Sequence, residues 1–243
     1  MKVRTVQVAI SVACLTMIAA CSTTASTVST GTSTQNDSSN SSTASAIITI
    51  KGEVWADNWF ALYNGETLIK EDSVPITTER SFNSESFTFQ ASYPLHLNFV
   101  VKDYKANDTG LEYIGTPKQQ TGDGGFVAQF TDVATGKVIA VTNQSAKVLV
   151  IHKAPLNPAC AKEANPIAGQ GTCRFTATLE PSTWKKSDFN DSAWSKASEF
   201  TMAEVGPKDG YLNIAWNSSA KFIWGSDLFA DNTVLVRMNV AAP

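Results

Sequence analysis

The sequence predicts an all-β domain, a sandwich or barrel of short antiparallel strands, and three observations carry this prediction. Apolar and polar residues alternate with a period of two along many short segments, which is typical of strands with one buried face. Turn-forming residues interrupt these segments at short intervals, as at 107–110, 122–125 and 134–136. No long 3.6-residue period is present, so short strands joined by regular turns are expected.

The expected strands follow one another along the second part of the chain. Residues 47–55 alternate in the manner of a half-buried strand, and 59–63 precedes Asn64-Gly65, a dipeptide typical of a type I′ hairpin that returns at 67–70. Further strands are expected at 86–91, 95–104, 125–131, 137–142, 147–152, 175–179, 211–215, 221–224 and 233–240.

The first 20 residues are expected to direct export. Lys2 and Arg4 give a positive start, and the uncharged, mostly apolar run from Val8 to Ala20 ends in small residues. A run of about thirteen residues is too short for a transmembrane helix, which needs roughly 20. A signal peptide over 1–20 is therefore predicted.

The segment Ile18-Ala-Ala-Cys21 resembles the lipobox of bacterial lipoproteins. In that family the signal is cut before the cysteine, which is then lipidated on its sulfur and its new amine, and several acyl chains hold a protein durably at a bilayer. The resemblance implies that Cys21 is lipidated; the alternative is an ordinary signal peptide with a chance cysteine. Ser22 resembles the pattern sorted to an outer membrane, which implies an anchor on the periplasmic or cell-surface face of that membrane.

Residues 22–45 are predicted to be a flexible tether. They are almost entirely Ser, Thr, Ala and Asn, without apolar periodicity to offset the entropy of ordering the chain. As a random coil the tether would hold its ends roughly 25–30 Å apart. The expected organisation is thus a lipidated cysteine with its linker over 21–45 and one β-sandwich domain over 46–243.

The charge and the cysteines narrow the classes of partner. The chain has 19 Lys and Arg against 22 Asp and Glu, and without Lys2 and Arg4 its net charge is −5. No basic stripe is present, so nucleic acid is not an expected partner. Cys160 and Cys173, with twelve residues between them, are most simply a disulfide outside the cytosol. Such a bond contributes about 3 kcal/mol in the chain-entropy treatment.

Four local patterns together resemble the galactose-binding-like jelly rolls. Residues 57–65, Asp-Asn-Trp-Phe-Ala-Leu-Tyr-Asn-Gly, are similar to a D-(D/N)-x-(F/Y)-x-x-Y-x-N-G hairpin, one residue shortened, and 124–128 is similar to a G-G-h-h-A strand. Residues 184–197 resemble a W…D-F-D-D-S-x-W-x-x-A segment, and 222–237 resembles an A-x-W-I-W…D-N-x-V-x-x-R ending. The resemblance implies a jelly-roll β-sandwich and, as a class, carbohydrate binding.

The same patterns have a physical interpretation as fold signatures. Asp188, Asp191 and Ser192 suit a polar turn, and short helical turns are expected within 186–194. We expect Trp224 in the core and Arg237 paired with an acid across a strand.

Signals of catalysis are scarce. His96 and His152 each lie in an alternating strand segment, where satisfied strand histidines are more common than a metal pair. No serine-hydrolase elbow, zinc-helix motif or phosphate loop is present. The sequence therefore predicts that the protein is not an enzyme, with a glycoside-hydrolase subunit using loop carboxylates as an alternative.

Aromatic and polar residues in loops are the expected ligand-binding groups, because sugars stack their apolar faces on rings and need polar partners for their hydroxyls. The candidates are Asp57, Trp59, Asn64, Tyr104, Asp123 and Trp216. Trp216, in a polar loop, is the best candidate for an exposed ring, and Trp55, Tyr63 and Tyr113 are further aromatic candidates; for any single ring, core packing is the more common role.

No cofactor is required by these patterns, but Ca²⁺ is a candidate. The acids that flank loops and could supply oxygen ligands are Asp103, Asp108, Glu112 and Asp123. No EF-hand spacing supports the site, and solvated turn acids are the alternative. The predicted function is a lipid-anchored envelope protein that binds carbohydrate or a surface protein, with an envelope-assembly lipoprotein as the alternative of a different class.

Overall fold

The computed structural model describes residues 46–243. The predicted signal peptide over 1–20, the lipidation site Cys21 and the linker over 21–45 lie outside the described residues. No helix within the described part has the length and apolar character needed to cross a bilayer.

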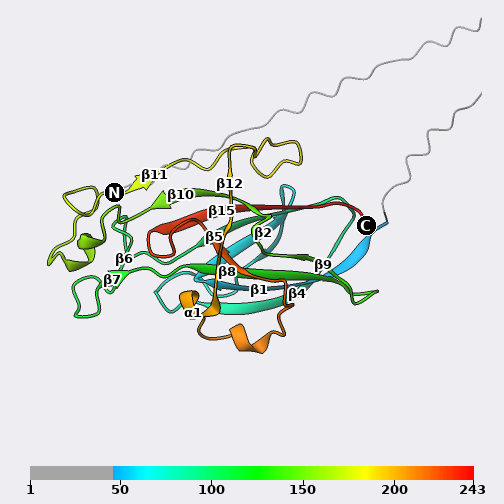
Figure 1. Cartoon of the computed structure of the whole chain (residues 1–243), viewed down its shortest axis with the longest axis horizontal. Coiled ribbons are helices and arrows are strands. Elements are labelled where there is room, and N and C mark those ends of the chain that lie inside the picture. The colour runs from blue at the N-terminus through cyan, green and yellow to red at the C-terminus, as the bar shows by residue number, and fades with distance from the viewer. Residues whose placement is uncertain (1–45) are drawn as a thin grey trace, which may run out of the picture. The chain divides into compact units, whose positions relative to one another are not determined.

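Residues 46–243 form two antiparallel sheets stacked face to face, as Figure 1 shows. The first sheet contains, in spatial order, β13 (Ser198–Phe200), β14 (Phe222–Trp224), β8 (Gly125–Asp132), β1 (Ile48–Asp57) and β4 (Asn83–Ala91), with β9 (Val138–Val141) also on β8. The second contains β11 (Thr176–Ala177), β10 (Lys147–Lys153), β15 (Asp231–Val240), β5 (Leu95–Lys102), β2 (Trp59–Asn64) and β3 (Thr67–Glu71), with β12 (Ser195–Lys196) also on β10. The predicted all-β jelly-roll sandwich is confirmed.

Smaller elements lie outside the two sheets. β6 (Leu111–Glu112) and β7 (Gln120–Thr121) form a separate two-stranded ribbon. The helical elements are the 3₁₀ turn η1 (Pro158–Lys162), the short helix α1 (Met202–Val205) and the 3₁₀ turn η2 (Tyr211–Asn213).

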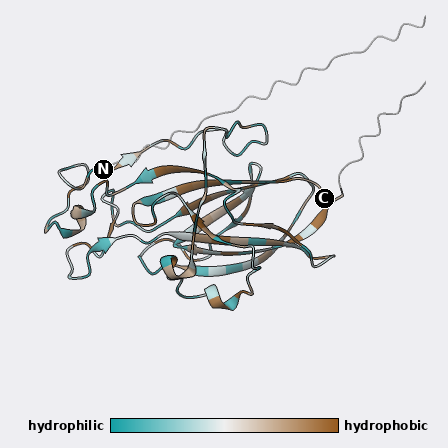
Figure 2. Ribbon diagram, in the orientation of Figure 1, coloured by the Kyte–Doolittle hydropathy of each residue, from teal (hydrophilic) through white to brown (hydrophobic). Residues whose placement is uncertain are grey.

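The main core lies between the two sheets. Alternate residues of the long strands point into it, including Val54 of β1 and Phe126 of β8, and the rings of Phe99 and Phe126 approach to 4.8 Å across the layers. Figure 2 shows hydrophobic residues concentrated on the central strands and hydrophilic ones on the loops. Trp224, 1% exposed, belongs to this core as expected.

A second apolar cluster covers the outer face of the β5–β15 sheet, which is why these two strands are buried on both faces. Val100 and Leu235 point away from the main core and pack with Trp184 and Trp194. These tryptophans lie in residues 180–196, which we call the covering segment. It forms turns but none of the helical elements expected within 186–194.

Arg237 fixes the covering segment to the sheet. Its side chain is 2% exposed, and its Nε donates to Asp191 Oδ2 at 2.9 Å while its guanidinium also donates to the backbone carbonyls of Trp184 and Lys186. The sequence predicted that Arg237 pairs with an acid across a strand. Its partner, Asp191, lies instead in the covering segment.

The first hairpin differs from the expected type I′ turn. Asn64 pairs with Thr67, so the two-residue loop is Gly65-Glu66, and Gly65 has φ 57°. A type I′ turn on Asn64-Gly65 needs positive φ at both residues. Asn64 instead stays in β2, where its Oδ1 accepts a hydrogen bond from the His96 backbone N–H at 3.0 Å.

Two expected strands are also different in the structure. Residues 211–215 contain η2 instead of a strand, because Trp216 Nε1 donates to the Tyr211 carbonyl at 3.0 Å and their rings stack, which closes a local turn. The strand expected at 175–179 is reduced to Thr176–Ala177.

The Cys160–Cys173 disulfide is confirmed. Both cysteines are buried with Leu111 of β6 in a small cluster of their own. The disulfide loop also contacts the β6–β7 ribbon, because Gln119 Nε2 donates to the carbonyls of Ala161 at 3.0 Å and Glu163 at 2.8 Å. The bond therefore fixes the segment that supports the loops at this end of the sandwich.

Candidate functional site: a buried acidic cluster under a polar pocket

The candidate site lies where the chain passes from one sheet to the other. β1 ends at Asp57 in the first sheet, and after Asn58 the chain enters β2 in the second sheet. The Asn58 N–H donates to the carbonyl of Lys102, the last residue of β5, at 2.8 Å. Asp103 follows β5 directly, so strand pairing alone brings Asp57 and Asp103 to the same end of the sandwich.

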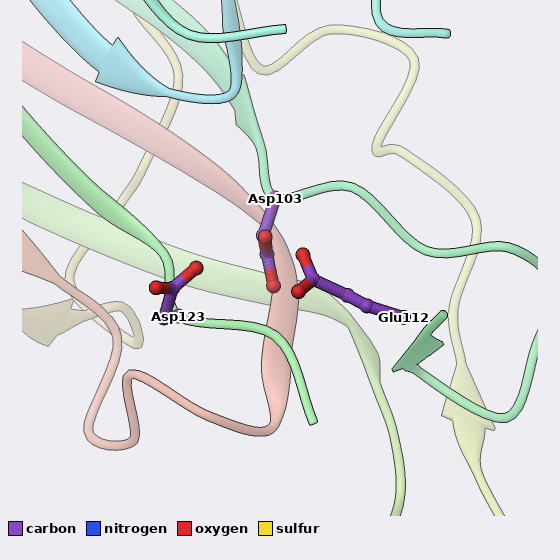
Figure 3. A group of neighbouring side chains, drawn as sticks. All are labelled: Asp103, Glu112 and Asp123. Carbon is purple, nitrogen blue, oxygen red and sulfur yellow. The ribbon is translucent and has the colours of Figure 1, made fainter. Parts of the chain in front are cut away.

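Two further acids reach this end from other segments. Asp57 pairs with Gly125, the first residue of β8, so Asp123 lies just outside that pair, and Glu112 comes from β6. Asp103, Glu112 and Asp123 each place a carboxylate oxygen within 4.8 Å of the others. We call these three residues the acidic cluster; Figure 3 shows their carboxylates converging from three separate segments.

The acids of this region are buried and poorly satisfied. Asp57 is 0% exposed, and Asp103 and Glu112 are each 2% exposed. Among residues 46–243, neither oxygen of Asp57 or Asp103 has a hydrogen-bond partner, and Glu112 has one only for Oε2, from Gln120 Nε2 at 3.0 Å. Buried ionised carboxylates without partners are costly, so they must be neutralised by protons or by a cation.

The electrostatic consequence is a set of raised pKa values. Burial, with a further contribution from Asp123, raises the pKa of Asp57 to about 8. Burial is also the main cause that raises the pKa of Glu112 to about 7, and burial followed by the charge of Asp57 raises the pKa of Asp103 well above its ordinary value. The site is therefore poised to hold protons or another positive charge near neutral pH.

Lys208 supplies a positive charge at the edge of this region. Its Nζ lies 2.9 Å from Asp123 Oδ2 and 3.8 Å from Asp57 Oδ2. Burial is the largest single influence and acts to lower the pKa of Lys208, but Asp57, Asp123 and Glu112 together outweigh it and leave the pKa raised. The lysine is held on a defined turn, because Trp55 Nε1 donates to the neighbouring Asp209 carbonyl at 3.0 Å.

Gly122 allows the β7–β8 loop to pass directly over Asp103. A Cβ at position 122 would overlap Asp103 Oδ2. Glycine is therefore required here for close approach of the backbone to a buried carboxylate.

A pocket of about 380 Å³ opens to solvent beside the acidic cluster. It is lined by Glu79, Arg80, Phe82, Glu112, Tyr113, Lys118, Gln120, Asp123 and Lys208. Tyr113 is held at φ 51°, and its carbonyl accepts hydrogen bonds from the backbone N–H and the Oγ1 of Thr116. We call this feature the loop-end pocket; it combines aromatic rings with charged and amide groups.

Only some of the residues predicted to bind a ligand lie at the candidate site. Asp57 and Asp123 belong to the site, and Tyr104 follows Asp103 directly in the chain, its N–H donating to Asn58 Oδ1. Asn64 lies instead in the first hairpin.

The two predicted tryptophans are not exposed platforms. Trp59 is half-buried on the outer face of the second sheet, with the Lys102 ammonium 4.7 Å from its ring. Trp216 is half-buried, stacked on Tyr211 and packed against the main core.

Three of the four acids proposed for Ca²⁺ are brought together. Asp108 is the exception: it is exposed, and its Oδ1 lies 2.5 Å from Lys105 Nζ and 3.2 Å from His152 Nε2. The histidines do not form a metal pair, since His96 contacts Asn239 and His152 contacts Asn232, near opposite ends of β15.

Sequence reasoning did not find Lys208 or the role of Gly122. Lys208 lies in a short turn between α1 and η2 with no periodic pattern, and Gly122 reads as an ordinary turn glycine. The chain matches no protein-family model, no curated protein and no solved structure. No relative therefore supplies its function, which is argued from the site and from the local sequence patterns.

Proposed function

We propose that the protein is a lipid-anchored envelope protein whose sandwich domain binds carbohydrate in the loop-end pocket without catalysis. The observation that carries this proposal is that the Tyr113 ring lines the same pocket as the hydrogen-bonding side chains of Arg80, Lys118 and Gln120. The resemblance to galactose-binding-like jelly rolls supports the same class of ligand.

The chemistry of the pocket suits a sugar. A pyranose ring has apolar faces that stack on aromatic rings and hydroxyls that need polar partners. Tyr113 offers a half-buried ring at a fixed backbone position, and Gln120 offers both a donor and an acceptor. Arg80 and Lys118 offer further hydrogen-bond donors for sugar hydroxyls, and Glu79 and Asp123 offer acceptors.

The burial of the acids at this site is more consistent with sugar binding than with glycoside hydrolysis. Glycosidases need two carboxyl groups that touch the sugar on either side of the scissile bond. Asp57, Asp103 and Glu112 are at most 2% exposed, whereas the Asp123 side chain is 30% exposed. A sugar in the pocket could therefore contact the half-buried carboxylates of Glu79 and Asp123, whereas Asp57 and Asp103 lie outside the pocket lining.

A glycan array with the full chain, followed by calorimetry on any hit, tests the proposal. We expect Tyr113→Ala to weaken binding at least tenfold, as the loss of a stacking ring does, while Tyr104→Ala, a half-buried ring outside the pocket lining, leaves it within about twofold. A blank array from folded protein would contradict carbohydrate binding and would favour a surface protein as the partner.

A further inference from the structure

The unpartnered carboxylates beneath the loop-end pocket have the chemistry of a cation site. We propose that Asp103, Glu112 and Asp123 bind one Ca²⁺, with Asp57 as a neighbouring negative charge that strengthens the site. This proposal stands apart from carbohydrate binding, because Asp57 and Asp103 lie outside the pocket lining and the ion would need no sugar to bind.

The burial of Asp57 without a hydrogen-bond partner in residues 46–243 is a second observation, separate from the acidic cluster, that points to a bound cation. Asp57 is 0% exposed and has no hydrogen bond to either oxygen among the described residues. Lys208 Nζ lies 3.8 Å from Asp57 Oδ2 and 2.9 Å from Asp123 Oδ2, so the Asp57 carboxylate lies beside a member of the cluster. A buried acid placed beside three others, without a donor of its own, is what a bound cation would balance.

The size and the type of the ligands favour Ca²⁺. The three oxygens lie within 4.8 Å of one another, which is the span across an ion with Ca–O distances of about 2.4 Å. All of the ligands are carboxylate oxygens, and neither His nor Cys belongs to the cluster, which disfavours Zn²⁺. Mg²⁺ usually keeps several of its waters, which a site with two ligands only 2% exposed accommodates poorly.

Lys208 has a defined part in this proposal as a competing charge. It brings one positive charge to a region with four acids, so it neutralises the site only in part. Its side chain is 42% exposed and lines the loop-end pocket, so it can move outward when an ion enters. Cation binding would thus be coupled to a rearrangement of one wall of the pocket.

Equilibrium dialysis and calorimetry of the full chain at pH 7.5, without carbohydrate, test the inference. We expect one Ca²⁺ per chain and Mg²⁺ binding at least tenfold weaker. Asp103→Asn and Glu112→Gln should each weaken Ca²⁺ binding at least tenfold. Asp108→Asn is the matched control, because that carboxylate lies outside the cluster, and it should leave the affinity within about twofold.

A lysine pair tests the competition directly. Lys208→Met should tighten Ca²⁺ binding severalfold by removing the nearby positive charge, whereas Lys118→Met, at a lysine that also lines the pocket but makes no ion pair among the described residues, should change it little. The proposal is overturned if folded wild-type protein and the Lys208→Met variant both fail to bind Ca²⁺, or if Asp103→Asn binds it normally. Misfolding does not obscure the result, because Asp103→Asn removes a buried acid and should melt no lower than metal-free wild type at this pH. The two proposals can fail separately, because the Ca²⁺ measurements contain no carbohydrate and Tyr113→Ala leaves all four acids in place.

Discussion

Gly122 lies against the carboxylate of Asp103 so closely that a Cβ at position 122 would overlap Oδ2 of the aspartate. The φ of Gly122 is not in the left-handed region, so the conflict is one of space and not of backbone conformation. The β7–β8 loop and the end of β5 are therefore fitted to one another at this contact.

This relationship predicts that Gly122→Ala destabilises the domain. We expect a loss of about 1–3 kcal/mol in the free energy of unfolding, the usual cost of overpacking, measured by urea denaturation. In an Asp103→Ala background, which makes room for the added methyl group, Gly122→Ala should cost less than about 1 kcal/mol. Equal costs in the two backgrounds would show that the contact is not the cause.

The raised pKa values predict that the chelator-treated protein loses stability as pH rises from about 5 to 9. A carboxyl with a raised pKa holds its proton in the folded state at pH values where the unfolded state has released it, so its stabilising effect is complete at low pH and is lost as pH rises through the folded value. That value is about 7 for Glu112 and about 8 for Asp57. Thermal melts across this range should fall by several degrees.

Two variants separate the acids that contribute to this pH dependence. Asp57→Asn should flatten the part of the curve near pH 8, while a step remains from Asp72, whose pKa burial raises to about 6. Asp108→Asn, at an exposed carboxylate whose pKa a hydrogen bond from Lys105 lowers, should leave the fall above pH 6 in place. A pH-independent melting temperature in the wild type would contradict the prediction.

The buried guanidinium of Arg237 predicts the strongest effect outside the candidate site. Arg237→Met keeps the apolar stem but leaves Asp191 and two backbone carbonyls of the covering segment without their donor. We expect a loss of about 2–4 kcal/mol and a red shift of tryptophan fluorescence, because Trp184 and Trp194 become more exposed. Lys221→Met, at an exposed lysine directly before β14, is the control and should shift neither quantity.

The disulfide predicts sensitivity to reduction. Replacing Cys160 and Cys173 by Ser should lower the free energy of unfolding by about 3 kcal/mol. It should also weaken ligand binding in the loop-end pocket, because the disulfide loop holds Gln119 of the β6–β7 ribbon through two hydrogen bonds. Treating the wild type with dithiothreitol should reproduce both effects and should leave the double variant unchanged.

The proposed anchor predicts that Cys21→Ala yields an unlipidated protein. In cells that process bacterial lipoproteins and are fed a labelled fatty acid, the wild type should carry the label and sediment with membranes, while Cys21→Ala should do neither. Cys14→Ala, within the predicted signal, should behave as the wild type. Label retained on Cys21→Ala would place the acyl chain elsewhere.

Much of the fold could be predicted from the sequence because its signals are local. The alternation in β1, the apolar runs of β5 and β15 and the turn glycines each depend on a few neighbouring residues. Prediction failed where a contact with another segment decided the conformation. Asn64 stays in β2 because β5 binds its side chain, and residues 211–215 turn because Trp216 folds back on Tyr211.

The candidate site could be predicted only in part. The sequence indicated Asp103, Glu112 and Asp123 as oxygen ligands because they flank loops, but it offered Asp108 on the same grounds. Solvent exposure distinguishes Asp108 from the three acids of the cluster. Asp108 points to the surface and pairs with Lys105, while the carboxylates of the cluster point toward one another. Nothing local distinguishes an inward acid from an outward one in an irregular loop.

The sequence by itself determined the period of the strands, the positions of most turns and the partner of Cys160, because each follows from short-range stereochemistry or from elimination among few candidates. Only the tertiary structure decided that Asp57 and Lys208 meet the acidic cluster. These residues lie on segments far apart in the chain, and their approach depends on how two sheets stack and where the loops between them end. A buried charge is a property of that packing, so it has no signature in the sequence alone.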